Sequence, residues 1–168
     1  LCIIDATRAG SGKSLLAEIA GTIATGQTPA TMSAPRGDEE WRKQITAQLK
    51  SGERFIVVDD VSGTLDSASL RRVITSSVWG DRVLGASRQI RLPAEATWCA
   101  TGNNLRPRGD MVRRCYLIRL DTKMVRPWER DEFKHPQPKW TRKHREELSA
   151  SLLTLARAWI EAGRPAPD

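Results

Sequence analysis

The chain has 168 residues, and its 27 lysines and arginines against 20 aspartates and glutamates give a formal net charge of +7. This length suits one domain with a sizeable core, and the basic balance favours an anionic partner such as nucleic acid or nucleotide. Three widely spaced cysteines argue against a disulfide framework or a zinc site, and no apolar run reaches the roughly 18 to 20 residues that span a bilayer, so we expect a soluble cytoplasmic protein without a membrane partner.

Short apolar runs alternate with helical patterns along the chain, an order typical of an α/β fold with a parallel sheet covered by helices. The predicted strands are residues 1–5, 30–34, 55–58, 97–101 and 115–120. The predicted helices are residues 15–25, 39–51, 66–76 and 141–162. Asp38 is the predicted N-cap of the second helix. The apolar stripe of the last helix consists of Leu148, Leu152, Leu155 and Trp159.

The stretch DRVLGASRQIRLP, residues 81–93, lies between the third predicted helix and the fourth predicted strand. Its two short arms, residues 82–84 and 88–92, flank Gly85-Ala86-Ser87. Small residues between two arms of this kind predict a β-hairpin with a flexible tip and basic shoulders.

The stretch DATRAGSGKS, residues 5–14, follows the first predicted strand and opens the first predicted helix. It fits the phosphate-binding pattern G-x-x-x-x-G-K-[ST] except at Thr7, which stands in place of the first glycine. In this setting the backbone N–H groups of residues 8–13 can converge on a β-phosphate, Lys13 can reach the β- and γ-oxygens, and Ser14 can bind magnesium. The predicted nucleotide-binding residues are Thr7, Ala9, Gly10, Ser11, Gly12, Lys13, Ser14 and Leu15. The alternative is a glycine-rich turn that binds nothing.

Two carboxylates follow the continuous apolar run Phe55-Ile56-Val57-Val58, which is typical of a central parallel strand buried on both faces. We assign Asp59 to the magnesium and Asp60 to the attacking water, because in a phosphate-loop fold this strand lies close to the first one. N-capping of the next helix is the alternative role for either residue.

Two further polar pairs flank predicted strands. Asn103-Asn104 follow the fourth strand, where a side-chain amide can hydrogen-bond a γ-phosphate or the water, although asparagine is also common in turns. Arg113-Arg114 precede the fifth strand and can reach the γ-phosphate of a neighbouring subunit, with a surface basic pair as the alternative. The catalytic candidates are Lys13, Asp60, Asn103, Arg113 and Arg114.

The ordered stretches TRAGSGKS, FIVVDD, TWCATGNN and GDMVRRCYLIRLD resemble the Walker A, Walker B, sensor 1 and arginine-finger motifs of the AAA+ ATPases, which are P-loop NTPases. The stretches VSGTLDSASL and VWGDRVLGASRQIRLP are similar to those of primase-helicase ATPases of prophages and integrative elements, which resemble superfamily 3 helicases. The resemblance implies a three-layer sandwich whose parallel five-stranded sheet has the order 5-1-4-3-2. It also implies ATP and Mg²⁺ as cofactors and a homo-oligomeric ring, commonly a hexamer, with nucleotide at the subunit boundaries.

The same resemblance implies a role for the predicted hairpin, since related helicases carry a hairpin in this interval that projects into the ring and grips the DNA backbone. Arg82, Arg88 and Arg91 would contact the phosphates of single-stranded DNA in the ring pore, and such contacts are independent of sequence and sensitive to salt. An ordinary edge hairpin with solvated arginines is the alternative. The leading hypothesis is the ATP-hydrolysing motor domain of a mobile element's replication helicase.

Two residues depart from the family pattern. Thr7 replaces a glycine, and Asp60 replaces the usual glutamate, which shortens the reach toward a water by about 1.5 Å. The ATPase core would span residues 1–121, an irregular linker and a short C-terminal helical extension would fill residues 122–168, and we expect a segment of a longer protein. The competing hypotheses are a non-translocating nucleotide switch that loads another replication protein and a small-molecule phosphotransferase.

Overall fold

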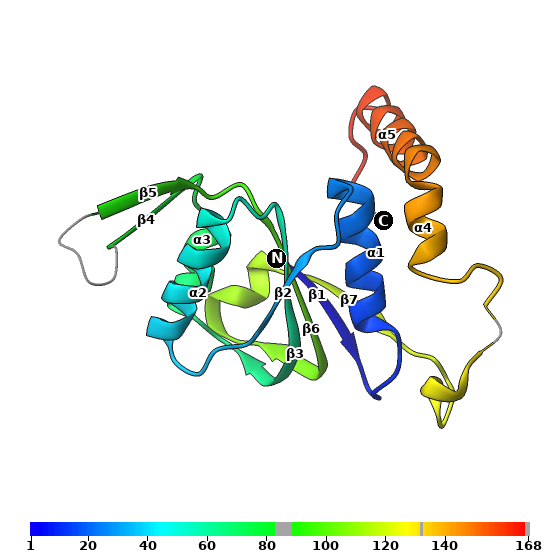
Figure 1. Cartoon of the computed structure of the whole chain (residues 1–168), viewed down its shortest axis with the longest axis horizontal. Coiled ribbons are helices and arrows are strands. Elements are labelled where there is room, and N and C mark those ends of the chain that lie inside the picture. Colours follow the sequence, from blue (N-terminus) through cyan, green and yellow to red (C-terminus); the bar gives the residue numbers. More distant parts are fainter. Residues whose placement is uncertain (83–88, 132, 167–168) are drawn as a thin grey trace.

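The computed structural model describes residues 1–82, 89–131 and 133–166, and its centre is a five-stranded sheet (Figure 1). The strands are β1 (Cys2–Ala6), β2 (Ala30–Ser33), β3 (Phe55–Leu65), β6 (Thr97–Pro107) and β7 (Tyr116–Leu120). They lie in the order β2-β3-β6-β1-β7, which is the predicted order 5-1-4-3-2 read from the other edge. Each strand pairs in parallel with its neighbour, so the predicted parallel sheet is confirmed.

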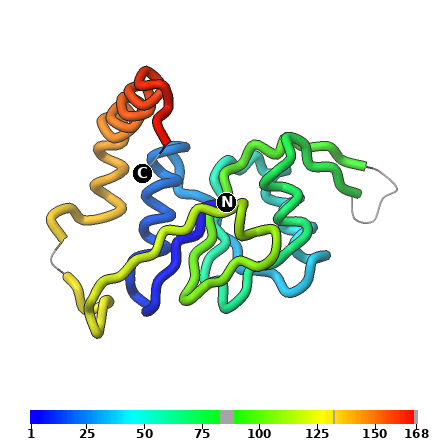
Figure 2. Tube along the Cα trace, turned by 180° about the vertical axis from the view of Figure 1, so that it is seen from behind, coloured from blue at the N-terminus to red at the C-terminus, as the bar shows by residue number. Residues whose placement is uncertain are grey.

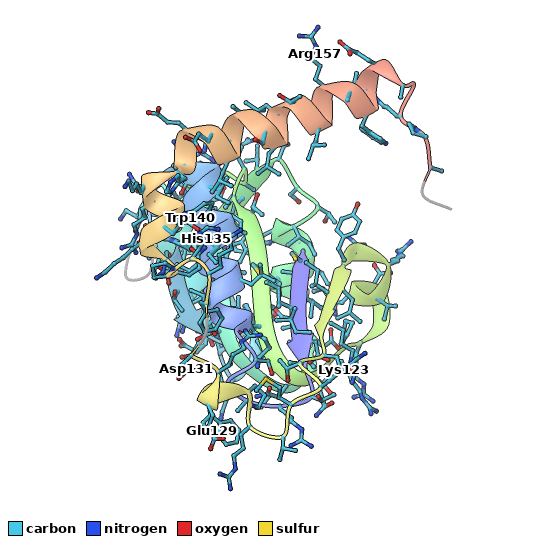
Figure 3. The ribbon with its side chains drawn as sticks, turned by 90° about the vertical axis from the view of Figure 1, so that its right-hand side faces the viewer. Lys123, Glu129, Asp131, His135, Trp140 and Arg157 are labelled. Atoms are coloured by element: carbon cyan, nitrogen blue, oxygen red, sulfur yellow. The ribbon has the colours of Figure 1, made fainter. Side chains whose placement is uncertain are left out.

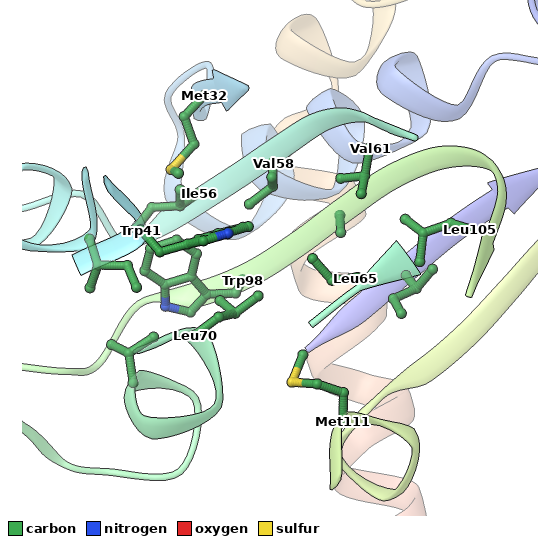
Figure 4. Close-up of a cluster of buried hydrophobic side chains, with 14 of the residues drawn as sticks. Met32, Trp41, Ile56, Val58, Val61, Leu65, Leu70, Trp98, Leu105 and Met111 are labelled. Carbon is green, nitrogen blue, oxygen red and sulfur yellow. The ribbon is translucent and has the colours of Figure 1, made fainter. Parts of the chain in front are cut away.

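Helices cover both faces of the sheet and make three layers (Figures 1 and 2). The helices on one side are α1 (Lys13–Thr25), α4 (Lys139–Lys143) and α5 (Arg145–Glu161), and those on the other are α2 (Asp38–Lys50) and α3 (Ala68–Val73). On α2, Trp41, Ile45 and Leu49 recur every four residues, and all three are buried in the larger core cluster (Figure 4). The apolar face read from the sequence of α2 is therefore the face that packs on the sheet.

β3 and β6 are longer than predicted, because their pairing continues past an irregularity. β3 pairs with β6 on both sides of Asp59 and Asp60, and these two residues lie opposite the single residue Thr101. Two residues facing one form a β-bulge, a device that re-aims side chains without ending the strand. The expectation that Asp59 and Asp60 come after the end of the strand is wrong: they lie inside β3, and Asn103-Asn104 likewise lie inside β6.

The predicted hairpin consists of β4 (Val78–Arg82) and β5 (Gln89–Pro93), which pair antiparallel and project from the body of the molecule (Figure 1). Its first arm begins four residues earlier than the predicted residue 82. Residues 83–88, which include the predicted tip and Arg88, lie outside the described residues. The base of the hairpin is anchored by Trp79, which is buried, donates from Nε1 to Thr46 Oγ1 at 2.8 Å and lies under the Arg72 guanidinium.

The single predicted helix of residues 141–162 is two helices, α4 and α5, which meet at His144. α4 begins two residues earlier than predicted, so Arg142 and Lys143 fall in its last turn. Positive charge is favourable at a helix C-terminus and unfavourable at a helix N-terminus. The single predicted helix would have placed Arg142 and Lys143 at its N-terminus. The Trp140 ring stacks on both His135 and His144, with 4.3 Å between ring centroids, and supports this junction (Figure 3).

α5 contacts α1 near its own first turns, where Arg145 Nε donates to the Thr22 carbonyl at 3.1 Å. None of the described residues of α5 is buried. Most of the predicted apolar stripe therefore does not pack on the body: Leu148 is half-buried, but Leu152, Leu155 and Trp159 are all exposed. Apolar periodicity identifies a helix face, but it does not show what covers that face.

The carboxylate of Asp38 has a different role from the predicted one. Gly37 occupies the N-cap position of α2, and Asp38 is the first helical residue. Its carboxylate instead accepts hydrogen bonds from Ser67 Oγ at 2.7 Å, Ser69 Oγ at 2.8 Å and the Ser69 N–H at 2.9 Å, at the start of α3. Burial tends to raise the pKa of this carboxyl, but the hydrogen bonds from Ser69 and Ser67 outweigh it and hold the pKa below the ordinary 3.8.

We expect Asp38→Ala to lower the free energy of unfolding by about 1 kcal/mol at pH 7, a typical cost of losing a helix-end acceptor. The stabilising contribution requires the ionised carboxylate, so it is present above pH 3.8 and is lost as the pH falls through the lower folded-state value. Urea denaturation of both proteins at pH 7 and near pH 3 measures this. A difference in midpoint that is the same at both pH values would contradict the assignment.

The three cysteines are free thiols, and the structure places Cys2 opposite Cys99 on the adjacent strands β1 and β6. A hydrogen bond with Cys99 lowers the pKa of the Cys2 thiol below its ordinary value.

Among the helices in the described ranges, none has the length and apolar character needed to cross a membrane.

Candidate functional site

Residues 7–12 form a glycine loop between β1 and α1. Gly10 and Gly12 have φ angles of 71° and 88°, in the left-handed region that glycine adopts without steric cost. The φ angle of Thr7 lies outside that region, so a threonine fits at this position without backbone strain. Ser11 Oγ donates to the Arg8 carbonyl at 2.6 Å and closes the loop. The departure from the glycine pattern at Thr7 therefore leaves the conformation of the loop intact.

The first turn of α1 directs two polar side chains at the neighbouring strands. Ser14 Oγ donates to Asp59 Oδ1 at 2.7 Å, and Lys13 Nζ donates to Asn103 Oδ1 at 2.8 Å. Lys13 is buried, with only 9% of its surface exposed. Four of the residues that the sequence singled out, from α1, β3 and β6, thus meet at one edge of the sheet.

Thr101 organises the two carboxylates at the β-bulge. Its hydroxyl donates to Asp59 Oδ1 at 2.5 Å and accepts from the Asp60 N–H at 3.2 Å. β3 and β6 lie very close together at the bulge. A Cβ added to Gly102 would lie 2.4 Å from the Val61 carbonyl oxygen. Glycine is therefore required at position 102, and the close approach holds Asp59 in reach of α1.

Asp60 adopts a left-handed backbone conformation, with φ of 52°. For a residue with a Cβ this conformation costs about 1 to 2 kcal/mol, and aspartate is among the residues that tolerate it best. The Asp60 side chain is exposed and, together with Asp59 and Arg36, lines a pocket of about 330 Å³. The two carboxylates therefore share this pocket but differ in their contacts, because Asp59 is half-buried and bonded to Ser14 and Thr101.

The two asparagines also separate in the structure. Asn103 is half-buried and bonded to Lys13, whereas Asn104 is exposed and has a left-handed φ of 53°. The chain after them is held by the buried carboxylate of Asp5, which accepts from the Leu105 N–H at 2.9 Å. Asn103 is therefore the residue whose amide faces the glycine loop.

The predicted catalytic arginines lie away from this cluster. They end the 3₁₀ helix Gly109–Arg114, just before β7, and the Leu1 amino group donates to the Arg114 carbonyl at 3.1 Å. Because β1 and β7 are parallel, the starts of both strands lie at the sheet edge opposite the glycine loop. The structure thus does not bring these arginines to the loop of their own chain.

Asp110 pairs with both arginines, at 2.5 Å in each ion pair. The hydrogen bonds from Arg114 and Arg113 hold the pKa of the Asp110 carboxyl below its ordinary value. The two arginines differ in exposure, because the Arg113 side chain is 73% exposed and that of Arg114 only 27%. The Arg114 Nε is buried without a hydrogen-bond partner among the described residues. Arg113 is consequently the one that can reach another molecule.

Two of the three predicted DNA-binding arginines are in the described part of the hairpin. Arg82 pairs with Gln89 and Arg91 with Gly80, so Arg82 and Arg91 lie on the same face of the two-stranded sheet. Both are exposed, and both line an open pocket of about 530 Å³ together with Arg42. An ion pair at 2.7 Å between Arg42 and Asp81 offsets part of this positive charge.

Three residues of these clusters were not predicted from the sequence: Thr101, Asp110 and Asp5. The residue type of each does not indicate which partner it will contact. Thr101, for example, bonds to Asp59 and Asp60 at the bulge. The position of Thr101, directly before Gly102 at the end of a buried run, is the only local signal.

The pair of Ser14 and Asp59 fits a magnesium ion. Mg²⁺ takes one or two protein oxygens and completes its octahedron with waters and phosphate oxygens. A hydroxyl and a carboxylate 2.7 Å apart beside the glycine loop provide this donor set. Within the described residues there is no cluster of three or more histidine, cysteine, aspartate or glutamate side chains that could hold a metal by protein ligands alone.

No known protein-family model matches the chain, and no curated protein matches its sequence.

Proposed function

We propose that the chain is an AAA+ type ATPase domain that hydrolyses ATP with Mg²⁺ and works as a ring on DNA during replication of a mobile element. The observation that supports it most is the pair of contacts from α1, Lys13 to Asn103 and Ser14 to Asp59. They place the Lys13 ammonium group, the Ser14–Asp59 pair and the Asn103 amide around the loop that leads into the N-terminus of α1. This arrangement is suited to a triphosphate.

Each residue has a role in this proposal. The loop N–H groups and Lys13 would bind the phosphates, and Ser14 and Asp59 would hold Mg²⁺, which neutralises phosphate charge when bound. Asp60, exposed beside the bulge, would orient and deprotonate the attacking water. Asn103 would exchange its bond with Lys13 for one with the γ-phosphate or the water.

The placement of Arg113 favours a shared site between subunits. Arg113 lies at the sheet edge opposite the glycine loop, so it can serve only the nucleotide of a neighbouring copy. Before a neighbouring copy binds, Arg113 would remain in its ion pair with Asp110. This geometry supports a head-to-tail assembly, which closes into a ring when the rotation between copies allows it.

The test of the ATPase proposal combines turnover and assembly. ATP hydrolysis is measured with and without single-stranded DNA, while the oligomeric mass is followed with and without ATP. We expect hydrolysis to rise with DNA and with assembly. Hydrolysis that is absent in every state would refute the ATPase, and hydrolysis by a monomer at full rate would refute the shared site.

We expect the double variant Arg82→Ala/Arg91→Ala to bind single-stranded DNA more weakly, with an affinity that depends less on the salt concentration. Two lost phosphate contacts should reduce the slope of log affinity against log salt by about 1.4. Fluorescence anisotropy across a salt series measures this, with Arg157→Ala on α5 as the control, because Arg157 is also an exposed arginine. An unchanged slope in the double variant would mean that the hairpin arginines are merely solvated.

A second candidate, a nucleotide switch that loads another replication protein, is favoured by Asp60. Its carboxylate is one methylene shorter than that of glutamate, and its backbone is left-handed, so hydrolysis would be slow enough for a long-lived bound state. Strand displacement separates the two candidates, because only a translocating motor unwinds a duplex.

A further inference from the structure

The segment that follows β7, residues 121–131, forms a strap across the glycine loop (Figure 3, Lys123 to Asp131). Arg8 Nη1 donates to the Val125 carbonyl at 2.8 Å. A Cβ on Gly10 would lie 2.9 Å from Trp128 Cβ and 3.1 Å from the Trp128 nitrogen. The backbone of residue 128 therefore rests directly on Gly10, and the strap is part of the same site as the loop.

The strap lies on the side of the loop that a nucleoside would occupy. Lys13 and Ser14 contact Asn103 and Asp59, which come from β6 and β3, on one side of β1. The strap continues from β7, on the other side of β1. A nucleotide whose terminal phosphates lie toward Asn103 and Asp59 must extend its sugar and base away from them, toward the strap.

Trp128 has the chemistry to receive that base. Its neighbour Pro127 is buried and fixes the strap, yet Trp128 is 60% exposed. A large aromatic ring held at its Cβ against the glycine loop and left open to solvent offers a stacking surface. Stacking of a base on an aromatic side chain strengthens binding about 5- to 150-fold and tolerates different bases, because every base has a π-face.

We propose that Trp128 is the base-stacking platform of the nucleotide site, an inference that rests on the proposed ATPase function. The ligand class is a nucleoside triphosphate. Because recognition is by stacking and not by hydrogen bonds to the base, GTP should compete with ATP within a few-fold.

The test measures equilibrium binding of Mg²⁺-ATP and of inorganic tripolyphosphate, which lacks a base, to the wild type and three variants. We expect Trp128→Ala to weaken ATP binding about tenfold or more, Trp128→Phe to stay within about threefold of wild type, and tripolyphosphate binding to be unchanged in all. Trp159→Ala, which removes another exposed tryptophan far along α5, is the control and should bind like wild type. Thermal unfolding of each variant checks that it is folded.

Two outcomes would overturn the inference alone. Trp128→Ala could bind ATP at least as tightly as wild type. Equal affinity would mean that the Trp128 side chain contributes nothing to binding, and higher affinity would mean that this side chain blocks the site. The variant could instead weaken ATP and tripolyphosphate equally, which would mean that Trp128 only braces the glycine loop. A wild type that binds neither ligand would refute the nucleotide site itself, so the two failures are distinguishable.

Discussion

Lys13→Ala should reduce ATP hydrolysis by at least about a hundredfold, the range seen when one preorganised donor to a developing charge is removed. Lys13 is buried at the start of α1, and its Nζ is held 2.8 Å from Asn103 Oδ1 beside the glycine loop. No other described lysine follows a glycine loop. Initial rates at saturating ATP measure the effect.

Lys50→Ala is the matched control for this variant. Lys50 is an exposed lysine in the last turn of α2, so its loss changes the net charge equally without touching the loop. Wild-type turnover by Lys13→Ala, in a protein that is folded by circular dichroism, would remove the basis of the proposed site.

Arg113→Ala should reduce assembly-dependent hydrolysis about a thousandfold and leave ATP binding within a few-fold of wild type. An arginine that stabilises the γ-phosphate in the transition state contributes on this scale. Arg113 is exposed and lies at the edge opposite its own glycine loop, so we expect its loss to affect the site of a neighbouring copy. ATP affinity and turnover are measured on the same preparation.

Mixing the variants tests whether the site is shared. A Lys13→Ala subunit still carries Arg113, and an Arg113→Ala subunit still carries an intact loop, so a mixture should recover part of the activity. Recovery that fails at every ratio, although the mixed subunits assemble, would contradict a shared site.

Arg114→Ala is the comparison that distinguishes the two arginines. Arg114 is mostly covered, pairs with Asp110 and has a buried Nε, so its removal should lower thermal stability more than that of Arg113. If Arg114→Ala abolished turnover with unchanged stability while Arg113→Ala was active, the roles assigned to the two would have to be exchanged.

Much of the fold could be predicted because its signals are local. The helical spacing of Trp41, Ile45 and Leu49 reflects a property of a single helix, and the glycine loop depends on backbone conformations at Gly10 and Gly12 that glycine itself supplies. The same locality explains why the apolar stripe of α5 could be found in the sequence, whereas its exposure could not. The order of the strands was an expectation from resemblance to a family, and the sheet matches it.

The sequence by itself therefore determined the alternating elements, the glycine loop and the polar residues of the candidate site. Only the tertiary structure decided which of those residues meet: Asn103 and not Asn104 faces Lys13. It also left the Arg113 side chain mostly exposed and that of Arg114 mostly covered. The bulge that aims Asp59 at Ser14 exists only when β3 pairs with β6. The strap contact joins Arg8 to Val125, 117 residues away, and such long-range contacts are set by the packing of the whole chain and leave no mark on either local stretch.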